Sequence, residues 1–200
     1  MTDILYSSFI SGTTSLCPFN DETYKLFDRW FSDQQLVALM GDWEFYPLPY
    51  YGQTAREFAE RTRKTTWIVC AMEQGSAVPI GYTGLYLQPR HRVGILRLAI
   101  AEAAYRRCGH GYRATQLALQ WAFEFLDLFT VHLSLAASNG PALGLYSKCG
   151  FRECGRYTKS RYEPGGRFDE IHMELLQQEW SPSKSGKMKA SEIPLGSRTR

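Results

Sequence analysis

The apolar residues of this chain are grouped in short runs of two kinds. Continuous or alternating runs bounded by turn residues are typical of β-strands, whereas apolar residues three or four positions apart are typical of one face of an α-helix. The turn residues Gly75-Ser76 and Pro89-Arg90-His91 separate three consecutive strand-like runs, which predicts an antiparallel meander. The strand-like runs cover residues 4–10, 65–73, 80–88, 92–100, 130–137, 151–162 and 167–176.

Helical spacing fills most of the intervals between these runs. Thr54, with Glu57 three residues later, is typical of a helix start, and Pro141 suits the first turn of a short helix that Gly150 would end. No internal repeat or linker divides the chain, so the pattern predicts one α+β domain over residues 1–180. The predicted helices cover residues 24–31, 32–41, 54–64, 112–126 and 141–147.

The net charge of +3 is unevenly distributed. In residues 181–200, five basic residues against one glutamate give a net charge of +4, which leaves −1 for the remaining body of the chain. This segment is rich in Ser, Lys and Gly and has no apolar periodicity, so we expect a disordered basic tail. Binding of the tail to nucleic acid or a membrane surface is an alternative, which we favour less than a solvated terminus.

The composition is that of a soluble globular protein, with 44% apolar and 22% charged residues. No run reaches the roughly 18 uncharged apolar residues of a membrane span. The start, MTDILYSSFI, has an acid and no basic region, so we expect no signal peptide. The five cysteines have no metal-ligand spacing, and we expect a reduced, cytoplasmic protein without a metal.

The segment YRRCGHGYR, residues 105–113, has the composition of an anion-binding loop. Gly109 and Gly111 let a ligand approach the backbone, and the predicted helix that follows directs its free N–H groups toward the loop. The three arginines would add charge-assisted hydrogen bonds. The nucleotide-binding patterns GxxxxGK[ST] and GxGxxG do not fit here, and a basic turn before a helix is the alternative interpretation.

Two motifs at matching distances resemble the GNAT superfamily of acyl-CoA-dependent N-acetyltransferases. The first is Arg106-x-x-Gly109-x-Gly111, and the second is Asn139-x-x-Ala142-x-x-x-Tyr146-x-x-x-Gly150-Phe151. The predicted order of elements around them also resembles that of the family, over residues 4–178. The resemblance implies a mixed, mostly antiparallel sheet that is splayed at the acetyl-CoA site and flanked by helices.

The C-terminal part resembles one branch of that superfamily, the ribosomal-protein N-terminal acetyltransferases and their diamine-acetylating relatives. Phe168-Asp169 and Met173-x-Leu175-Leu176 carry this likeness. The implied cosubstrate is acetyl-CoA, bound by the strand end, the glycine loop and the second motif. The implied acetyl-CoA contacts are Leu98, Ala99, Ile100, Arg106, Arg107, Cys108, Gly109, His110, Gly111, Tyr112, Asn139, Ala142 and Tyr146.

Some of these residues have simpler alternatives. Asn139 could cap the helix that follows it, and we expect the His110 side chain to face solvent. Cys108 beside the phosphate site could act as an acyl carrier, although we favour direct transfer. Tyr146 is the expected general acid, because a phenol with a pKa of about 10 can protonate a leaving thiolate. A buried core tyrosine is the alternative.

The general base is where the chain departs from the pattern that the resemblance implies. Some relatives have a Glu before the Gly-Ile pair of the fourth strand, where this chain reads Arg92-Val93-Gly94-Ile95, and others have a Glu where it has Ser134. Deprotonation of the amine would then run through water held by Ser134, with Glu73 and Glu44 as further candidates. A degenerate protein that binds acetyl-CoA as a sensor or scaffold stays an alternative.

An aromatic, proline-rich segment, residues 43–52, is the predicted wall of the acceptor pocket. Its aromatic residues could equally form a small apolar cluster. Asp42 and Glu44 are the acids nearby, fewer than we expect for a polyamine, so a peptide or protein N-terminus is the favoured acceptor and a polyamine or aminoglycoside the alternative. We expect a monomer or homodimer. The candidate acceptor-binding residues are Trp43, Tyr46, Tyr50 and Tyr51.

Overall fold

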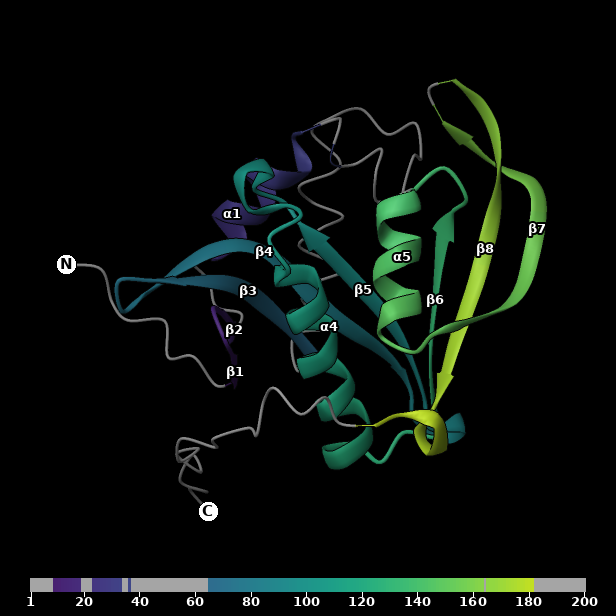
Figure 1. Cartoon of the computed structure of the whole chain (residues 1–200), viewed down its shortest axis with the longest axis horizontal. Helices are drawn as coiled ribbons and strands as arrows, with labels where there is room; N and C mark the ends of the chain where they lie inside the picture. Colours follow the sequence, from purple (N-terminus) through teal and green to yellow (C-terminus); the bar gives the residue numbers. More distant parts are fainter. Residues whose placement is uncertain (1–8, 19–22, 34–35, 37–64, 164, 182–200) are drawn as a thin grey trace, which may run out of the picture.

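The computed structural model describes residues 9–18, 23–33, 36, 65–163 and 165–181. Within these ranges, eight strands form one sheet in the order β1-β2-β3-β4-β5-β6-β8-β7 (Figure 1). Neighbouring strands are antiparallel except β5 and β6, which are parallel. The strands are β1 (Phe9–Ser11), β2 (Thr14–Pro18), β3 (Thr66–Glu73), β4 (Ser76–Gln88), β5 (Val93–Ile100), β6 (Thr130–Ala136), β7 (Arg152–Glu163) and β8 (Gly166–Leu176).

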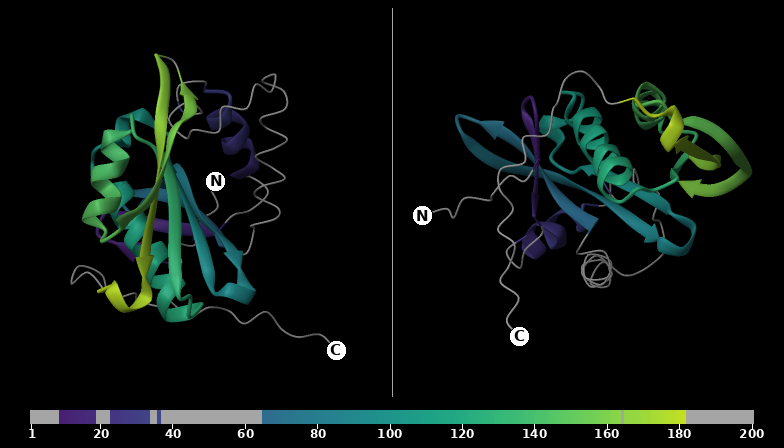
Figure 2. Two further views of the ribbon diagram at one scale, coloured as in Figure 1. Left: turned by 90° about the vertical axis from the view of Figure 1, so that its right-hand side faces the viewer. Right: turned by 90° about the horizontal axis from the view of Figure 1, so that it is seen from below.

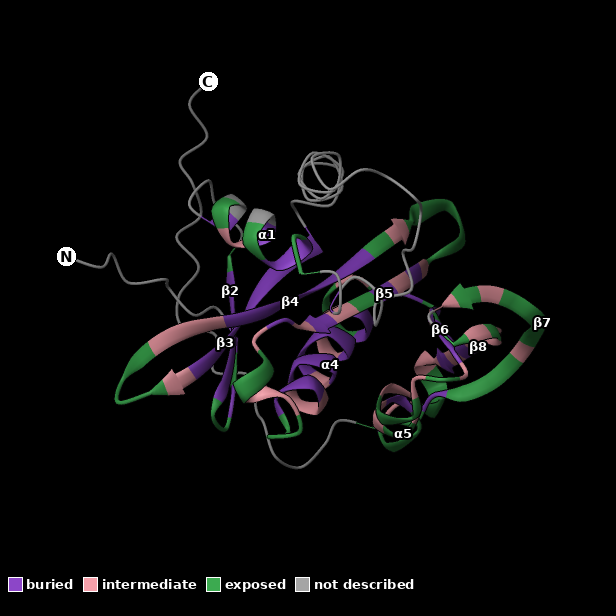
Figure 3. Cartoon of the chain, turned by 90° about the horizontal axis from the view of Figure 1, so that it is seen from above, coloured by how far each residue is buried: buried purple, intermediate pink, exposed green. Residues whose placement is uncertain are grey.

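The helices lie on both faces of this sheet. Helices α4 and α5 cover one face, which we call the α4/α5 face, and α1 covers the opposite one, the α1 face (Figures 2 and 3). The predicted α+β class and the mixed, mostly antiparallel sheet are therefore confirmed. In the described part of the chain, the helices are α1 (Thr23–Phe31), α4 (His110–Gln120) and α5 (Gly140–Lys148), with single turns at Pro89–His91, Ala103–Tyr105, Trp121–Phe125 and Gln177–Glu179.

The central strands are buried on both faces, which explains why their apolar runs are continuous. In β3, Val69 packs into the core under α4 and α5, whereas its neighbour Ile68 packs into the second core beneath α1. Both side chains are fully buried. A strand covered on both faces has no polar face to alternate with its apolar one, so the run TWIVCA reads as one apolar block.

The parallel pair β5–β6 separates partway along its length. Its pairing covers three positions only and ends at Ile95 and His132, while β6 continues to pair with β8 as far as Ala136. Beyond this point the strands diverge, which leaves a gap in the sheet between Leu96–Ile100 and the second half of β6 (Figure 1). The expected splay is therefore present.

The N-terminal hairpin differs from the predicted single strand at residues 4–10. The chain forms β1, turns at Gly12 and returns as β2, which pairs with β3. Thr14 and Ser15 of β2 are fully buried although they are polar, and this polar core strand has no apolar alternation by which to predict it. Residues 1–8 lie outside the described part of the chain.

The predicted helix over residues 112–126 begins earlier and ends in a wider turn. It starts at His110, and its last turn has the π-type bond from the Leu126 N–H to the Trp121 carbonyl, at 3.1 Å. Among the described residues, no helix has the length and apolar character to cross a membrane. The helices predicted at 32–41 and 54–64, the aromatic segment and the tail beyond Ser181 fall outside the described residues, except for Ser32, Asp33 and Leu36, and stay predictions.

Candidate active site

The glycine loop joins the end of β5 to the start of α4. Gly109 is the N-cap residue and has a φ of +84°, a left-handed conformation that favours glycine. No side chain of the described residues caps this helix start, so its first N–H groups have no partner within the helix. The free N–H groups and the positive end of the helix dipole fit a phosphate, the ligand that the sequence analysis expects at this loop.

The arginines of the loop divide into two groups. The Arg106 guanidinium donates hydrogen bonds to the carbonyls of Ile100, at 2.9 Å, and Ala101, at 2.7 Å. Arg106 thus fixes the end of β5 to the loop, which differs from the predicted contact with a phosphate. Arg107 is exposed, and Arg113 donates from Nη1 to the Cys108 carbonyl at 3.3 Å. These two cations lie at the rim of the loop.

His110 is buried, so the prediction of a solvent-facing side chain is wrong. The residue is 6% exposed, and its Nδ1 lies 2.8 Å from the Thr14 hydroxyl. The error came from starting the helix at Tyr112, because a start at His110 places the imidazole on the first turn, against β2. Burial, with the nearby Arg113 charge, lowers the pKa of His110. A neutral imidazole therefore connects the loop to the N-terminal hairpin.

We expect Thr14→Val to destabilise the fold, because it removes the hydroxyl partner of the buried imidazole. An unsatisfied buried polar group costs about 1–3 kcal/mol, which urea denaturation at pH 7.5 would measure. The lowered pKa of His110 means that wild-type stability should fall as the pH drops through and below about 6.5, where an unfolded imidazole takes up a proton. The matched control is Thr158→Val on exposed β7, expected within about 0.5 kcal/mol of wild type. Equal stability of Thr14→Val and the control would contradict this role.

Gly111 is buried where α4 approaches β5 and α5. A Cβ atom at this position would lie 2.8 Å from Leu145 Cδ1 and 3.6 Å from Leu98 Cδ2. Gly111 therefore permits close packing in addition to presenting its amide. A larger residue at position 111 would displace α5, which carries Tyr146. A Cβ atom added at Gly109 would instead meet only the flexible end of the Arg113 side chain.

Asn139 caps α5, as the alternative interpretation predicted. Its Oδ1 accepts a hydrogen bond from the Ala142 N–H at 3.2 Å, and Pro141 occupies the first turn. Asn139 and Ala142 also line the cavity described below. The cap therefore fixes the start of the helix that positions Tyr146.

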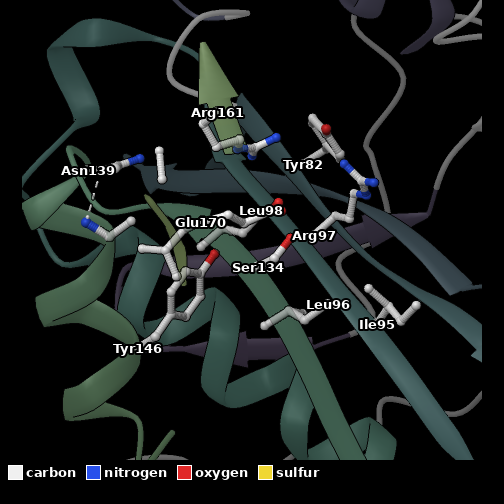
Figure 4. A pocket seen from close by; sticks show the side chains of 13 residues that line it. Tyr82, Ile95, Leu96, Arg97, Leu98, Ser134, Asn139, Tyr146, Arg161 and Glu170 are labelled. Carbon is white, nitrogen blue, oxygen red and sulfur yellow. Dashed lines mark hydrogen bonds between the residues drawn. The ribbon is translucent and has the colours of Figure 1, made fainter. Parts of the chain in front are cut away.

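Tyr146 combines a core ring with a hydroxyl at the cavity. The residue is 8% exposed, and its ring packs edge-on against Phe151 with centroids 5.7 Å apart. The hydroxyl points into the cavity between the splayed strands (Figure 4). Burial raises the pKa of Tyr146 well above its usual value. The phenol thus keeps its proton at physiological pH, as a general acid for a leaving thiolate requires.

The gap between β5 and β6 opens into a cavity of about 210 Å³. Tyr146 reaches it from α5, on the α4/α5 face. Arg97 reaches it from the α1 face, because it shares a side of β5 with Ala99, which packs beneath α1. The cavity therefore connects the two faces of the sheet. It is lined by Tyr82, Ile95, Leu96, Arg97, Leu98, Ser134, Leu135, Ala136, Asn139, Ala142, Tyr146, Arg161 and Glu170 (Figure 4).

Two polar residues of β6 and β8 enter the cavity from the α1 face. Ser134 lies between Leu133 and Leu135, whose side chains belong to the core of the α4/α5 face. Glu170 pairs with Ala136 in the register of β6 and β8. Ser134 thus lines the cavity, and its predicted role in holding a water stays a prediction; Glu170 is a carboxylate that the sequence analysis missed. The alternation of Glu170, His172 and Glu174 with apolar residues in EIHMEL was the available signal.

Other predicted residues lie elsewhere. The Glu73 carboxylate accepts a hydrogen bond from the Tyr105 hydroxyl at 2.7 Å and is not part of the cavity wall, and neither is the exposed Cys108. Among the residues that the structure describes, no three His, Cys, Asp or Glu side chains form a metal-binding group. The predicted acceptor residues Trp43, Tyr46, Tyr50 and Tyr51, together with Glu44, lie outside the described residues.

Comparison with known proteins identifies a family model that matches most of this chain. The model is described as "Acetyltransferase (GNAT) family" and matches residues 18–151. Among curated proteins, an N-acetyltransferase 9-like protein of Caenorhabditis briggsae is 27% identical over 80% of this chain and 81% of its own length. The alpha/beta-tubulin-N-acetyltransferase 9 of Mus musculus is 24% identical over 69% of this chain and 61% of its own length.

Two further comparisons point to polyamine-acetylating proteins. A spermidine N(1)-acetyltransferase of Vibrio cholerae is 32% identical over 36% of this chain and 43% of its own length. The crystal structure of a Vibrio cholerae spermidine N-acetyltransferase in complex with CoA and spermine has a TM-score of 0.70 at 19% identity, over 84% of this chain and 97% of that chain. At this identity the structural likeness concerns the fold.

Proposed function

The chain belongs to the GNAT acetyltransferase family and is an N-acetyltransferase that uses acetyl-CoA, and we propose that its acceptor is the α-amine of a peptide or protein N-terminus. The observation that carries this proposal is the cavity in the splayed sheet. It combines the Tyr146 hydroxyl, on the side of α5, with an opening toward the α1 face that contains Ser134 and Glu170. A thioester carbonyl and an incoming amine could therefore meet from opposite faces of the sheet.

Acetyl-CoA supplies the thioester that the amine attacks. The free N–H groups at the start of α4 would hold its pyrophosphate, with Arg107 and Arg113 at the rim. The second half of β5, which has no strand partner on the β6 side, offers backbone groups to the pantetheine arm. The end of β5, the loop and Arg107 are contacts that the resemblance implies, whereas Arg113 is an addition that follows from its place beside the Cys108 carbonyl.

Tyr146 would act on the leaving sulfur. The C–S bond breaks as the N–C bond forms, and the phenol proton passes to the thiolate sulfur. The tyrosinate that results would regain a proton from solvent. Because burial raises the pKa of Tyr146, the phenol carries its proton when the reaction begins.

Glu170 would accept the proton that the attacking amine loses, directly or through a water held by Ser134. An amine must be neutral to attack, and a carboxylate at the acceptor side of the cavity provides the base that both family positions lack. The intact set of Tyr146, Ser134 and Glu170 favours catalysis over a degenerate sensor or scaffold.

The charge of the cavity favours a peptide over a polyamine. Its described lining contains two arginines, Arg97 and Arg161, and one acid, Glu170. A polyamine carries several positive charges, which the arginines would repel. The similarity to spermidine acetyltransferases keeps the polyamine as the second candidate.

The proposed function is tested by free-thiol release from acetyl-CoA with purified protein and a panel of amines. The panel contains short peptides with different first residues, the same peptides with blocked α-amines, spermidine and an aminoglycoside. We expect turnover of the free peptides alone. Turnover of spermidine or the aminoglycoside alone would replace the proposed acceptor.

We expect Glu170→Gln to lower kcat/KM for the acceptor at least about tenfold, because the amide cannot accept a proton. The affinity for acetyl-CoA should be unchanged. The defect should shrink above about pH 8, where a peptide α-amine is already neutral. Activity measured from pH 6.5 to 9 checks this expectation, with exposed Glu124→Gln as the matched control. A defect that is the same at every pH would remove Glu170 from proton transfer.

A further inference from the structure

Three charged side chains enter the cavity from the sheet, on the side where the proposed acceptor arrives. Arg97 comes from β5, Glu170 from β8 and Arg161 from β7 (Figure 4). Arg161 and Glu170 are both half-buried. The three residues belong to elements far apart in the sequence, and the sheet brings them to one cavity. Its described lining is therefore both cationic and anionic, with the positive charge in excess.

The arginines do not belong to the phosphate site of the glycine loop. On β5, Leu98 and Ile100 point toward α4, since a Cβ atom at Gly111 would lie 3.6 and 3.8 Å from their side chains. Arg97 lies on the other side of the strand, with Ala99. Arg161 belongs to the β7–β8 hairpin, at the opposite edge of the sheet from the N-terminal strands.

Two guanidinium groups beside one carboxylate are complementary to a ligand that has both an amine and an acid. Glu170 matches the amine, and a guanidinium is suited to a carboxylate because its planar N–H groups pair with both carboxylate oxygens. Both arginines have other interactions within the folded chain. A guanidinium offers five N–H donors, so it can bind a substrate acid while keeping a neighbour.

We propose that this N-acetyltransferase selects peptide N-termini that carry an aspartate or glutamate within the first three residues, with Arg97 and Arg161 binding the acidic side chain. This inference rests on the proposed function, since it concerns the same cavity and the same amine. The limit of three residues follows from the arginines and Tyr146 lining one small cavity, whereas an extended chain advances about 3.3 Å per residue.

The test compares kcat/KM for a set of peptides that all have the same length and the same first residue. The peptides differ in carrying Glu, Gln or Lys at the second position or at the third. Wild-type protein should prefer the best Glu peptide over its Gln counterpart about tenfold or more, and over its Lys counterpart by a larger factor. The same comparison is made with Arg97→Gln, with Arg161→Gln and with the double variant. The matched control is Arg90→Gln, an exposed arginine before β5.

The expected result is a preference for Glu that decreases in each single variant and disappears in the double variant, while the control keeps the wild-type preference. The Gln peptide serves as the internal standard, because a variant that is only poorly folded would lose activity toward all peptides equally. Calorimetric affinity for acetyl-CoA confirms that each variant retains its cosubstrate site.

Two results would overturn the inference alone. The first is wild-type turnover of peptides with no preference for Glu, or with a preference for Lys. The second is a preference for Glu that survives in the double variant. No turnover of any peptide would instead overturn the proposed function, and this inference with it.

Discussion

Tyr146→Phe should lower kcat by about 100-fold or more while leaving the affinity for acetyl-CoA within about twofold of wild type. The reason is that general acid catalysis contributes about 10²–10⁴-fold, and Phe removes the proton donor and little else. The ring that packs against Phe151 is retained, so the core should stay intact. Stopped assays of thiol release and calorimetric titration with acetyl-CoA measure the two quantities.

The pH dependence provides a second readout of Tyr146. Burial raises the pKa of this hydroxyl, so its ionisation should not limit activity below about pH 10, the usual tyrosine value. Tyr157→Phe, which changes an exposed tyrosine of β7, is the matched control and should retain wild-type kcat. Wild-type kcat in Tyr146→Phe would assign protonation of the sulfur to solvent and leave Tyr146 a core residue.

Gly109→Ala should weaken acetyl-CoA binding at least about tenfold. A residue with a Cβ atom pays about 1–2 kcal/mol in the left-handed conformation, and here it also meets the Arg113 guanidinium, with its Cβ 2.9 Å from Nη1. Relief of that contact and of the backbone strain would turn the loop amides away from the phosphates. Isothermal titration with acetyl-CoA measures the effect.

The turn between β3 and β4 offers a control with the same backbone conformation. Gly75 has a φ of +83°, and a Cβ atom there would meet nothing within 4 Å. Gly75→Ala should therefore lose stability to a similar degree and bind acetyl-CoA like wild type. If both variants bound acetyl-CoA with wild-type affinity, the glycine loop would not be the phosphate site.

The local motifs predicted the elements of the sheet centre and their order because each strand is long, apolar and followed by clear turn residues. The short helix α5 was predictable because Pro141 and Gly150 mark its two ends. The hairpin β1–β2 was not, because its buried residues Thr14 and Ser15 are polar.

The site was predictable where a motif fixes a backbone shape, and less so where long-range pairing brings side chains together. Gly109 adopts the left-handed backbone conformation that its motif favours, and Asn139 and Tyr146 line the cavity. Glu170 was missed because only the register of β8 against β6 brings it to the cavity. His110 was misassigned because helix starts shift easily by one or two residues, and such a shift turns a side chain from solvent to core.

The most direct test of the central claim is to locate the acetyl group on the product. A peptide with one free α-amine and one internal lysine is incubated with acetyl-CoA and the protein, and the product is fragmented in a mass spectrometer. The account predicts acetylation of the α-amine, lost when Tyr146 is replaced by Phe. Acetylation of the lysine side chain, or of spermidine in a mixed reaction while the peptide stays unmodified, would contradict it.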